Sequence, residues 1–333
     1  MLTAQSVKML EYLVILLDDT STSYCHYTSK ESSGLSKLIS KKNLKDAILF
    51  AMKENLSIQY IYPAYVLPAD YTNIINSLDH TKTMPLHSKN SEDADVVILK
   101  GVEDLHSLAT PYQDKLLTLQ MKMSELYSLV NLLQERKKKF KRLNIVFTDI
   151  LEATESILST YKEELDNLVE YVFEEYQSGN PVQINILTDR MNQKTMNNCD
   201  AGISQITLAP NGKFYICPAF YYENEDSSVG DLERGINIKN KQLYSLSHAP
   251  ICRVCDAFQC HRCIWMNKKS TFEVNTPSHE QCVAAHLERN ASKRLIEKLQ
   301  TLNTYHFDTE IEEIDYWVSR NLVGKSINIG DTE

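Results

Sequence analysis

The chain has 333 residues, which is enough for one large domain or two ordinary ones. Hydrophobic residues make up 43% of it and charged residues 24%, and a count of only 9 Gly and 9 Pro excludes a low-complexity or collagen-like protein. The net charge of −9 lacks the basic excess typical of nucleic-acid binding. Because no apolar run approaches about 18 residues and no signal-peptide pattern precedes Asp18, we expect a cytoplasmic protein without a membrane partner.

The N-terminal half alternates apolar runs with helical patterns. Its clearest helix, 42–54, repeats Leu44, Ala47, Ile48 and Ala51 at helical spacing. Strands are expected at 13–17, 58–62, 96–99, 145–147 and 182–187, and further helices at 113–139 and 155–177. This order predicts an α/β fold with a parallel sheet, and five strands are too few for a closed eight-stranded barrel. We therefore expect a partial or degenerate (β/α) barrel.

Seven of the eight cysteines fall in one stretch near the C-terminus, while Cys25 stands alone. The seven are Cys199, Cys217, Cys252, Cys255, Cys260, Cys263 and Cys282. An odd number of clustered cysteines in a chain without an export signal argues against a disulfide framework and favours metal ligation.

The spacing of these cysteines favours iron–sulfur clusters over one zinc ion. Two Cys-x-x-Cys pairs, 252–255 and 260–263, are separated by four residues, whereas zinc knuckles are commonly separated by about 15 to 20. So short a gap favours division of the cysteines between two centres, as in iron–sulfur proteins. Seven thiolates would fill one four-ligand cluster and leave three for another.

Two local patterns place the outer cysteines. Residues 203–208 and 213–217 read as the strands of a hairpin around Pro210-Asn211-Gly212, which brings Cys199 and Cys217 together. Residues 278–281 have capping-box spacing ahead of an amphipathic helix that runs through Leu299. Cys282 is then expected in the first helical turn, where the helix dipole favours a thiolate.

The whole pattern, Cys199-x12-Gly212-x4-Cys217 followed by Cys252-x2-Cys255-x4-Cys260-x2-Cys263-x18-Cys282, resembles the SPASM domain of radical SAM peptide-modifying enzymes. The resemblance covers about 90 residues and implies two auxiliary 4Fe-4S clusters. It assigns the first to Cys199, Cys217 and Cys263, and the second to Cys252, Cys255, Cys260 and Cys282. Two gaps in the middle block are one residue shorter than is usual in that family.

The loop after the first strand departs from radical SAM enzymes, which carry Cys-x3-Cys-x2-Cys there. Residues 18–27 contain only Cys25, and Tyr62-Pro-Ala-Tyr65 stands where a Gly-Gly-Glu would follow the second strand. We therefore expect no conventional SAM cleavage by this chain alone. The combination resembles the CXXX-repeat peptide maturase family, which implies a Cys-rich precursor peptide and a radical SAM partner enzyme.

Several other residues admit both structural and functional interpretations. Cys25 reads as a remnant ligand, a reactive thiol or a small buried side chain. The candidates for the fourth ligand of the three-cysteine centre are one histidine among His248, His261, His279 and His286, or else Asp200. The basic run 136–142 suits a helix end or an interaction patch. The tyrosines at 60, 62, 65, 221 and 222 suit core packing or a peptide groove, and the acidic tail at 308–315 suits a docked helix or an interaction segment.

These observations lead to a three-part organisation: a degenerate radical-SAM-like domain at 1–190, a SPASM-like domain at 191–300 and a tail at 301–333. The leading hypothesis is an iron–sulfur component of a ribosomal peptide maturation system, acting with a partner radical SAM enzyme. The alternative is a zinc-stabilised, non-catalytic module that binds a peptide or partner.

Overall fold

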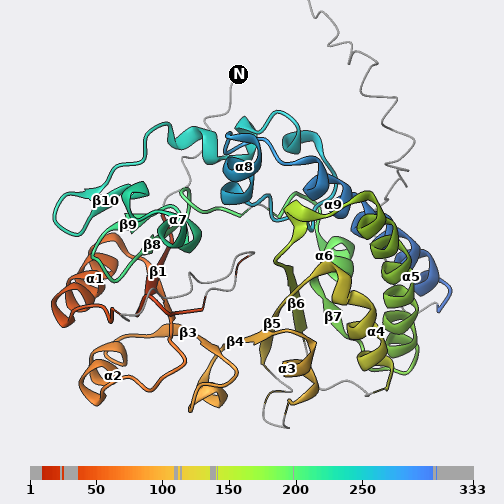
Figure 1. Ribbon diagram of the computed structural model, residues 1–333, viewed down its shortest axis with the longest axis horizontal. Helices are drawn as coiled ribbons and strands as arrows, with labels where there is room; N and C mark the ends of the chain where they lie inside the picture. The colour runs from red at the N-terminus through yellow and green to blue at the C-terminus, as the bar shows by residue number, and fades with distance from the viewer. Residues whose placement is uncertain are drawn as a thin grey trace, which may run out of the picture.

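A nine-stranded, mostly parallel sheet organises the chain. The computed structural model describes residues 10–22, 25, 37–108, 112, 115–135, 140, 142–197, 199–302 and 305. The strands are β1 (Tyr12–Leu16), β2 (Ser57–Ile61), β3 (His80–Pro85), β4 (Val96–Lys100), β5 (Leu116–Met121), β6 (Arg142–Phe147), β7 (Gln183–Ile184), β8 (Gln205–Leu208) and β9 (Phe214–Tyr215). Their order is β7-β6-β5-β4-β3-β2-β1-β8-β9, and only β9 is antiparallel to its neighbour. The sheet curves but does not close (Figure 1), so the predicted α/β partial barrel is confirmed.

Helices pack on the outside of this sheet and across its open side. They are α1 (Lys41–Glu54), α2 (Ala69–Ile75), α3 (Val102–His106), α4 (Leu126–Glu135), α5 (Glu155–Gln177), α6 (Asn185–Asn192), α7 (Pro218–Glu223), α8 (Ile264–Thr271) and α9 (His279–Gln300). The segment between α7 and α8 holds the short β10 (Gly230–Asp231) and β11 (Gly235–Ile236) and several 3-10 turns. Within the described residues, no helix is long and apolar enough to cross a membrane.

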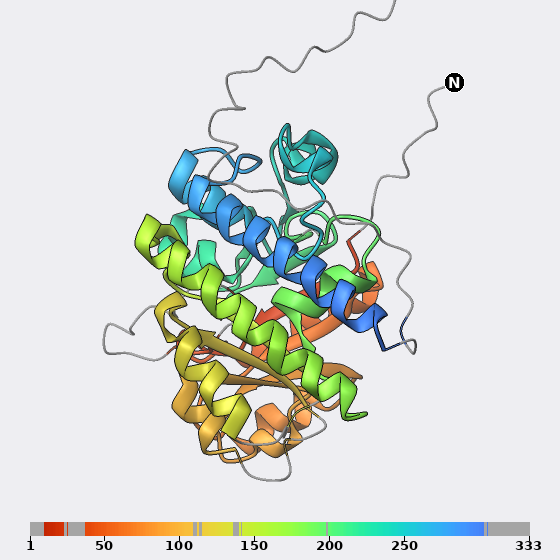
Figure 2. The ribbon, with the colours of Figure 1, turned by 90° about the vertical axis from the view of Figure 1, so that its right-hand side faces the viewer.

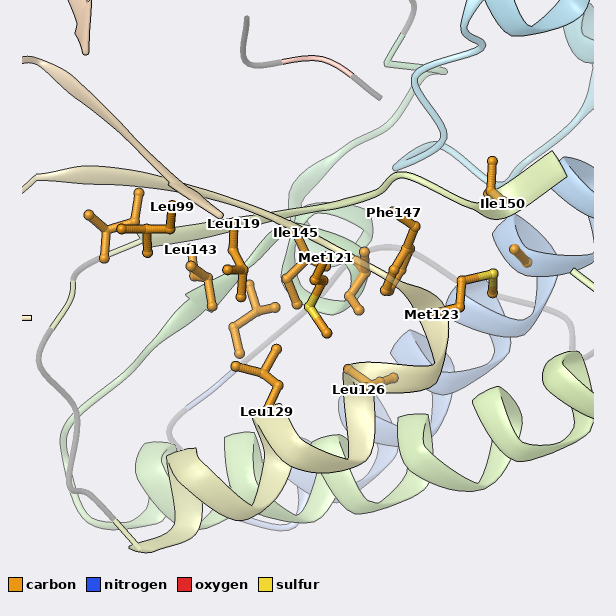
Figure 3. Close-up of a cluster of buried hydrophobic side chains, with 14 of the residues drawn as sticks. Leu99, Leu119, Met121, Met123, Leu126, Leu129, Leu143, Ile145, Phe147 and Ile150 are labelled. Carbon is orange, nitrogen blue, oxygen red and sulfur yellow. The ribbon is translucent and has the colours of Figure 1, made fainter. Parts of the chain in front are cut away.

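The two faces of β1 enter two different cores. Leu13 and Ile15 pack with α1 and α2, whereas Val14 and Leu16 belong to the larger cluster that extends through β4, β5 and β6 to α4 and α5. Figure 3 shows part of the larger cluster, in which Leu119 and Met121 of β5 face Leu126 and Leu129. Burial on both faces is why this strand reads as a continuous apolar run.

The structure corrects the expected helix at 113–139. Residues 116–121 form β5, which pairs with β4 and β6, and α4 begins only at Leu126. Leu, Gln and Met are good helix formers, but Leu117, Leu119 and Met121 alternate along one face of the strand, and pairing with two neighbours outweighs the local preference. The strand β3 and the short helices α2 and α3 were not predicted.

The expected strand at 182–187 is also mostly wrong. Only Gln183 and Ile184 pair with β6, and α6 begins at Asn185. The Asn185 side chain accepts from the Ile145 amide at 2.8 Å and donates to the Ile145 carbonyl at 3.0 Å. These side-chain bonds replace the next step of the strand ladder and allow the backbone to turn into a helix.

Helix α9 lies along α5 and attaches the C-terminal region to the barrel, as Figure 2 shows. Arg294 pairs with Asp166 at 2.6 Å and Lys298 with Glu170 at 2.8 Å, while the Tyr161 hydroxyl donates to buried Glu288 at 2.7 Å. Of the tail 301–333, only residues 301, 302 and 305 are described, so the predicted tail helix lies outside the described residues. Most of the basic run 136–142 also lies outside them, and its Arg142 belongs to β6.

Candidate metal centre

The hairpin β8–β9 forms as expected and positions Cys217. Thr207 and Leu208 pair with Tyr215 and Phe214, and the turn between them is closed by the Gly212 amide, which donates to the Ala209 carbonyl at 2.9 Å. Gly212 has φ +78°, and a Cβ there would lie 2.8 Å from the Asn43 side chain. Only glycine fits both conditions. The chain leaves β9 through buried Cys217, which precedes α7.

The structure brings Cys199, Cys217 and Cys263 together, and places Cys25 with them. All four line one cavity of about 450 Å³, which Cys260 also lines. Burial raises the pKa of Cys217, and the neighbouring Cys25 and Cys199 thiols raise it further. Burial likewise raises the pKa of Cys263 above its usual value, with Cys199, Cys217 and Cys25 adding to the rise. We call Cys25, Cys199, Cys217 and Cys263 the inner thiol group.

The remaining four cysteines form a second set, which we call the outer thiol group. Burial raises the pKa of Cys282 to about 12, and the nearby Cys252 and Cys255 thiols contribute. Burial also raises the pKa of Cys260, where Cys282 and Cys252 contribute alongside Glu288. As expected, Cys282 lies in the first turn of α9, whose cap Ser278 accepts from the Gln281 amide at 3.2 Å.

A buried arginine lies between the two thiol groups. Arg262 is 1% exposed, adopts φ +45° and donates through Nη2 to the Tyr244 carbonyl at 2.5 Å. Burial lowers its pKa, while Cys252 of the outer group and Cys199 of the inner group raise it. The positive charge of Arg262 therefore offsets negative charge on thiolates of both groups. No pattern in the sequence distinguished Arg262, because its role depends on which thiols surround it.

The loop between the two Cys-x-x-Cys pairs is held by two further arginines. Arg289 of α9 pairs with the Asp256 carboxylate at 2.6 Å, and Arg190 of α6 donates to the Asp256 carbonyl at 2.7 Å. The Arg190 guanidinium also stacks over the Phe258 ring, with its Cζ 4.1 Å from the ring centroid. Two helices distant in sequence, α6 and α9, thus fix the turn on which the outer thiols lie.

The loop after β1 is tied to residues that follow other strands. Buried Asp18 accepts from the Tyr65 hydroxyl at 2.7 Å, and Tyr222 donates to the Ser21 carbonyl at 2.5 Å. Tyr221 donates to the Asp19 carboxylate. Three of the tyrosines considered for a peptide groove therefore hold this loop.

The histidines suggested as ligands take different positions. His286 Nε2 lies 3.4 Å from Cys255 Sγ, in the outer group rather than beside the three-cysteine centre. His261 lines the cavity, and its carbonyl accepts from the Cys199 amide at 2.7 Å. His248 is exposed and its ring is 3.1 Å from Ser247 Oγ. Asp200 lines the same cavity.

The donor chemistry suits iron–sulfur clusters. Thiolates are the usual cluster ligands, and each thiol group supplies four. In the described part of the chain, no three His, Cys, Asp or Glu side chains are grouped closely enough to hold one metal ion.

Comparison with known proteins gives a match at the level of fold. No family model matches the chain, and no curated protein matches its sequence. A histidine-tagged anaerobic sulfatase-maturating enzyme, anSMEcpe, with bound AdoMet has a TM-score of 0.61 at 12% identity, covering 89% of this chain and 96% of that chain. Native anSMEcpe with bound AdoMet and Cp18Cys peptide has a TM-score of 0.59 at 12% identity, covering 89% and 100%.

Streptococcus suis SuiB bound to precursor peptide SuiA is a more distant match, with a TM-score of 0.47 at 13% identity, covering 83% of this chain and 76% of that chain. The matches to the two anSMEcpe structures cover most of this chain and nearly all of the other. This chain therefore has the radical SAM-like α/β fold of the sulfatase-maturating enzymes.

Proposed function

We propose that this chain is an iron–sulfur component of a peptide maturation system, in which one cluster is held by Cys199, Cys217 and Cys263 and a second by the outer thiol group. The observation that carries the proposal is the grouping of the seven C-terminal cysteines into a set of three and a set of four, with Arg262 close to thiols of both sets. Such clusters supply electron transfer or a coordination site at iron. Arg262 offsets their negative charge, and the Asp256 ion pair holds the outer ligand loop.

The peptide part of the proposal is supported by the fold and the cavity. One anSMEcpe structure contains both AdoMet and a peptide. In this chain the cavity beside the inner thiols has a mixed lining, with Trp265 and Phe147 alongside the polar Asn144 and Arg142. A lining of this kind suits a peptide that carries both apolar and polar side chains. We propose a Cys-rich precursor peptide as its occupant.

The same proposal assigns SAM cleavage to a partner enzyme. The segment 18–27 holds one cysteine, and three thiolates are needed for the SAM-cleaving cluster. In this chain the Asp18 carboxylate, which follows β1, accepts a hydrogen bond from the Tyr65 hydroxyl, which follows β2. A radical SAM enzyme that modifies the bound peptide is therefore the proposed partner.

Metal analysis of the anaerobically purified full chain tests the proposal. We expect about eight iron and eight sulfide ions per chain, four of each per cluster, with the visible absorption and EPR spectra of 4Fe-4S centres. A matched variant, Cys282→Ser, should lower the iron content by about half because it removes one ligand of the outer group. Zinc without sulfide, in protein made with sufficient iron, would instead establish the zinc-stabilised binding module.

Binding of the peptide is measured separately. A synthetic peptide with Cys-x-x-x repeats should bind the reconstituted chain in isothermal titration calorimetry, and the same peptide with serine in place of cysteine should bind more weakly. Equal affinity for the two peptides would contradict recognition of the thiols.

A further inference from the structure

We propose that Cys25 is the fourth thiolate ligand of the inner cluster, so that the loop after β1 completes a site in the C-terminal region. This inference rests on the proposed function, because it concerns a ligand of a cluster held by Cys199, Cys217 and Cys263. In sequence Cys25 is 174 residues from the nearest of them. In the structure it lines the same cavity as all three, together with Cys260 of the outer group.

The position of Cys25 is fixed from two sides. On one side, α7 begins directly after Cys217, and its Tyr222 hydroxyl donates to the carbonyl of Ser21 at 2.5 Å. On the other side, Gln120 of β5 donates through Nε2 to the Cys25 carbonyl at 3.0 Å. Tyr222 of α7 therefore holds the backbone at Ser21, and Gln120 of β5 holds it at Cys25.

Buried hydrogen bonds along the loop support this placement. Asp18 Oδ1 accepts from the Thr20 amide at 2.9 Å, and the Ser21 hydroxyl donates to the Ile61 carbonyl at 2.8 Å. Asp18, Ser21 and Thr22 are all at most 5% exposed. These hydrogen bonds hold residues 18–22 in a buried turn at the end of β1.

Packing agrees with this assignment, because Cys25 lies against the hydrophobic core that contains the Cys217 and Cys263 side chains. Four thiolates saturate the iron atoms of a 4Fe-4S cluster. A consequence is that the inner cluster has no iron open to an external ligand, and that it links the barrel to the C-terminal region.

The test compares Cys25→Ser with Thr22→Val, a matched change at a buried position in the same loop that leaves every thiol in place. Both are made in the full chain, purified anaerobically and reconstituted. The inference expects Thr22→Val to keep the wild-type iron and sulfide content. Cys25→Ser should lose iron from the inner cluster only, seen as a 3Fe-4S EPR signal or as a fall to about four irons per chain.

A second measurement uses the unmodified protein and so does not depend on folding of a variant. Cysteines are alkylated before and after removal of the clusters with a chelator, and each site is quantified by mass spectrometry. Cys25 should be protected with Cys199, Cys217 and Cys263, and should become labelled together with them.

The outcomes separate the inference from the function on which it rests. Wild-type protein with two clusters, unchanged iron and spectra in Cys25→Ser, and full labelling of Cys25 in the loaded protein would overturn the Cys25 assignment and leave the proposed function intact. Wild-type protein that takes up neither iron nor sulfide would overturn the proposed function itself.

Discussion

Glu288 is a buried ionisable group, 8% exposed, beside the cavity. Its carboxylate accepts from the Tyr161 hydroxyl at 2.7 Å and from Gln259 Nε2 at 3.2 Å. Burial nevertheless raises the pKa of Glu288 to about 7, from an ordinary value of 4.5, since these two bonds only partly replace the lost hydration. Its protonation therefore couples the stability of the α5–α9 contact to pH.

This coupling has a definite sign. Below about pH 4.5 the carboxyl is protonated in both the folded and the unfolded chain, and its favourable contribution to folding is fully present. Between about pH 4.5 and 7 only the unfolded chain releases the proton, so the free energy of unfolding falls by about 3 kcal/mol as pH rises. We expect Glu288→Gln to remove this part of the pH dependence of the free energy of unfolding.

Urea unfolding of the wild type and Glu288→Gln at about pH 5 and about pH 7.5 measures that difference. Glu297→Gln is the control, because Glu297 lies on the same helix with an exposed side chain. An identical change in unfolding free energy with pH in the wild type and in Glu288→Gln would contradict the assignment.

Helix α9 carries one thiol of the outer group, and it also packs the C-terminal region against α5. It carries Cys282 in its first turn, Arg289 toward the outer loop, and an apolar face that includes fully buried Leu295. Its ion pairs with α5 are half-exposed, so solvent screening leaves them a small share of the stability. Apolar burial rather than charge is therefore expected to hold the two helices together.

Two substitutions on α9 distinguish these contributions. Leu295→Ala should reduce the free energy of unfolding by about 2 to 5 kcal/mol, because it leaves a cavity at a site with no exposure. Lys298→Ala, which breaks the pair with Glu170, should cost less than about 1 kcal/mol. Denaturant unfolding of both variants checks the order, and a larger loss in Lys298→Ala would show that charge dominates this contact.

For the whole molecule, the two regions differ in what stabilises them. The barrel strands β4, β5 and β6 form continuous ladders and bury large apolar side chains against α4 (Figure 3). Residues 224–263 instead contain two-residue strands and short 3-10 turns, including Lys241–Tyr244 and Cys252–Val254. The outer ligand loop has few backbone ladders of its own, so cluster binding is expected to supply much of its order.

Cluster removal should therefore act unequally along the chain. After chelation, we expect amides in 224–263 to exchange hydrogen much faster, while amides in β4, β5 and β6 keep their protection. Hydrogen exchange followed by mass spectrometry, on loaded and chelated samples of the full chain, measures both regions at once. Equal loss of protection in β5 would show that the barrel also depends on the clusters.

The sequence alone predicted features that depend on local chemistry. Alternating strands and helices indicated the parallel sheet, Pro210-Asn211-Gly212 indicated the hairpin, and Ser278 indicated the start of α9. Turns, caps and periodicity depend on residues that are close together in the sequence, so these features could be predicted. The clustered cysteines likewise identified the candidate metal centre before any contact was known. Which cysteines share a cluster remains a prediction.

Tertiary structure decided what depends on distant neighbours. Residues 116–121 became a strand because β4 and β6 lie on either side of it, against their helical preference. Arg262 lies close to thiols of both groups, and Cys25 lines the same cavity as Cys217, with Gln120 of β5 bonded to its carbonyl and Tyr222 of α7 to that of Ser21. Contacts such as these join segments more than 90 residues apart in sequence, so spacing and periodicity could not reveal them.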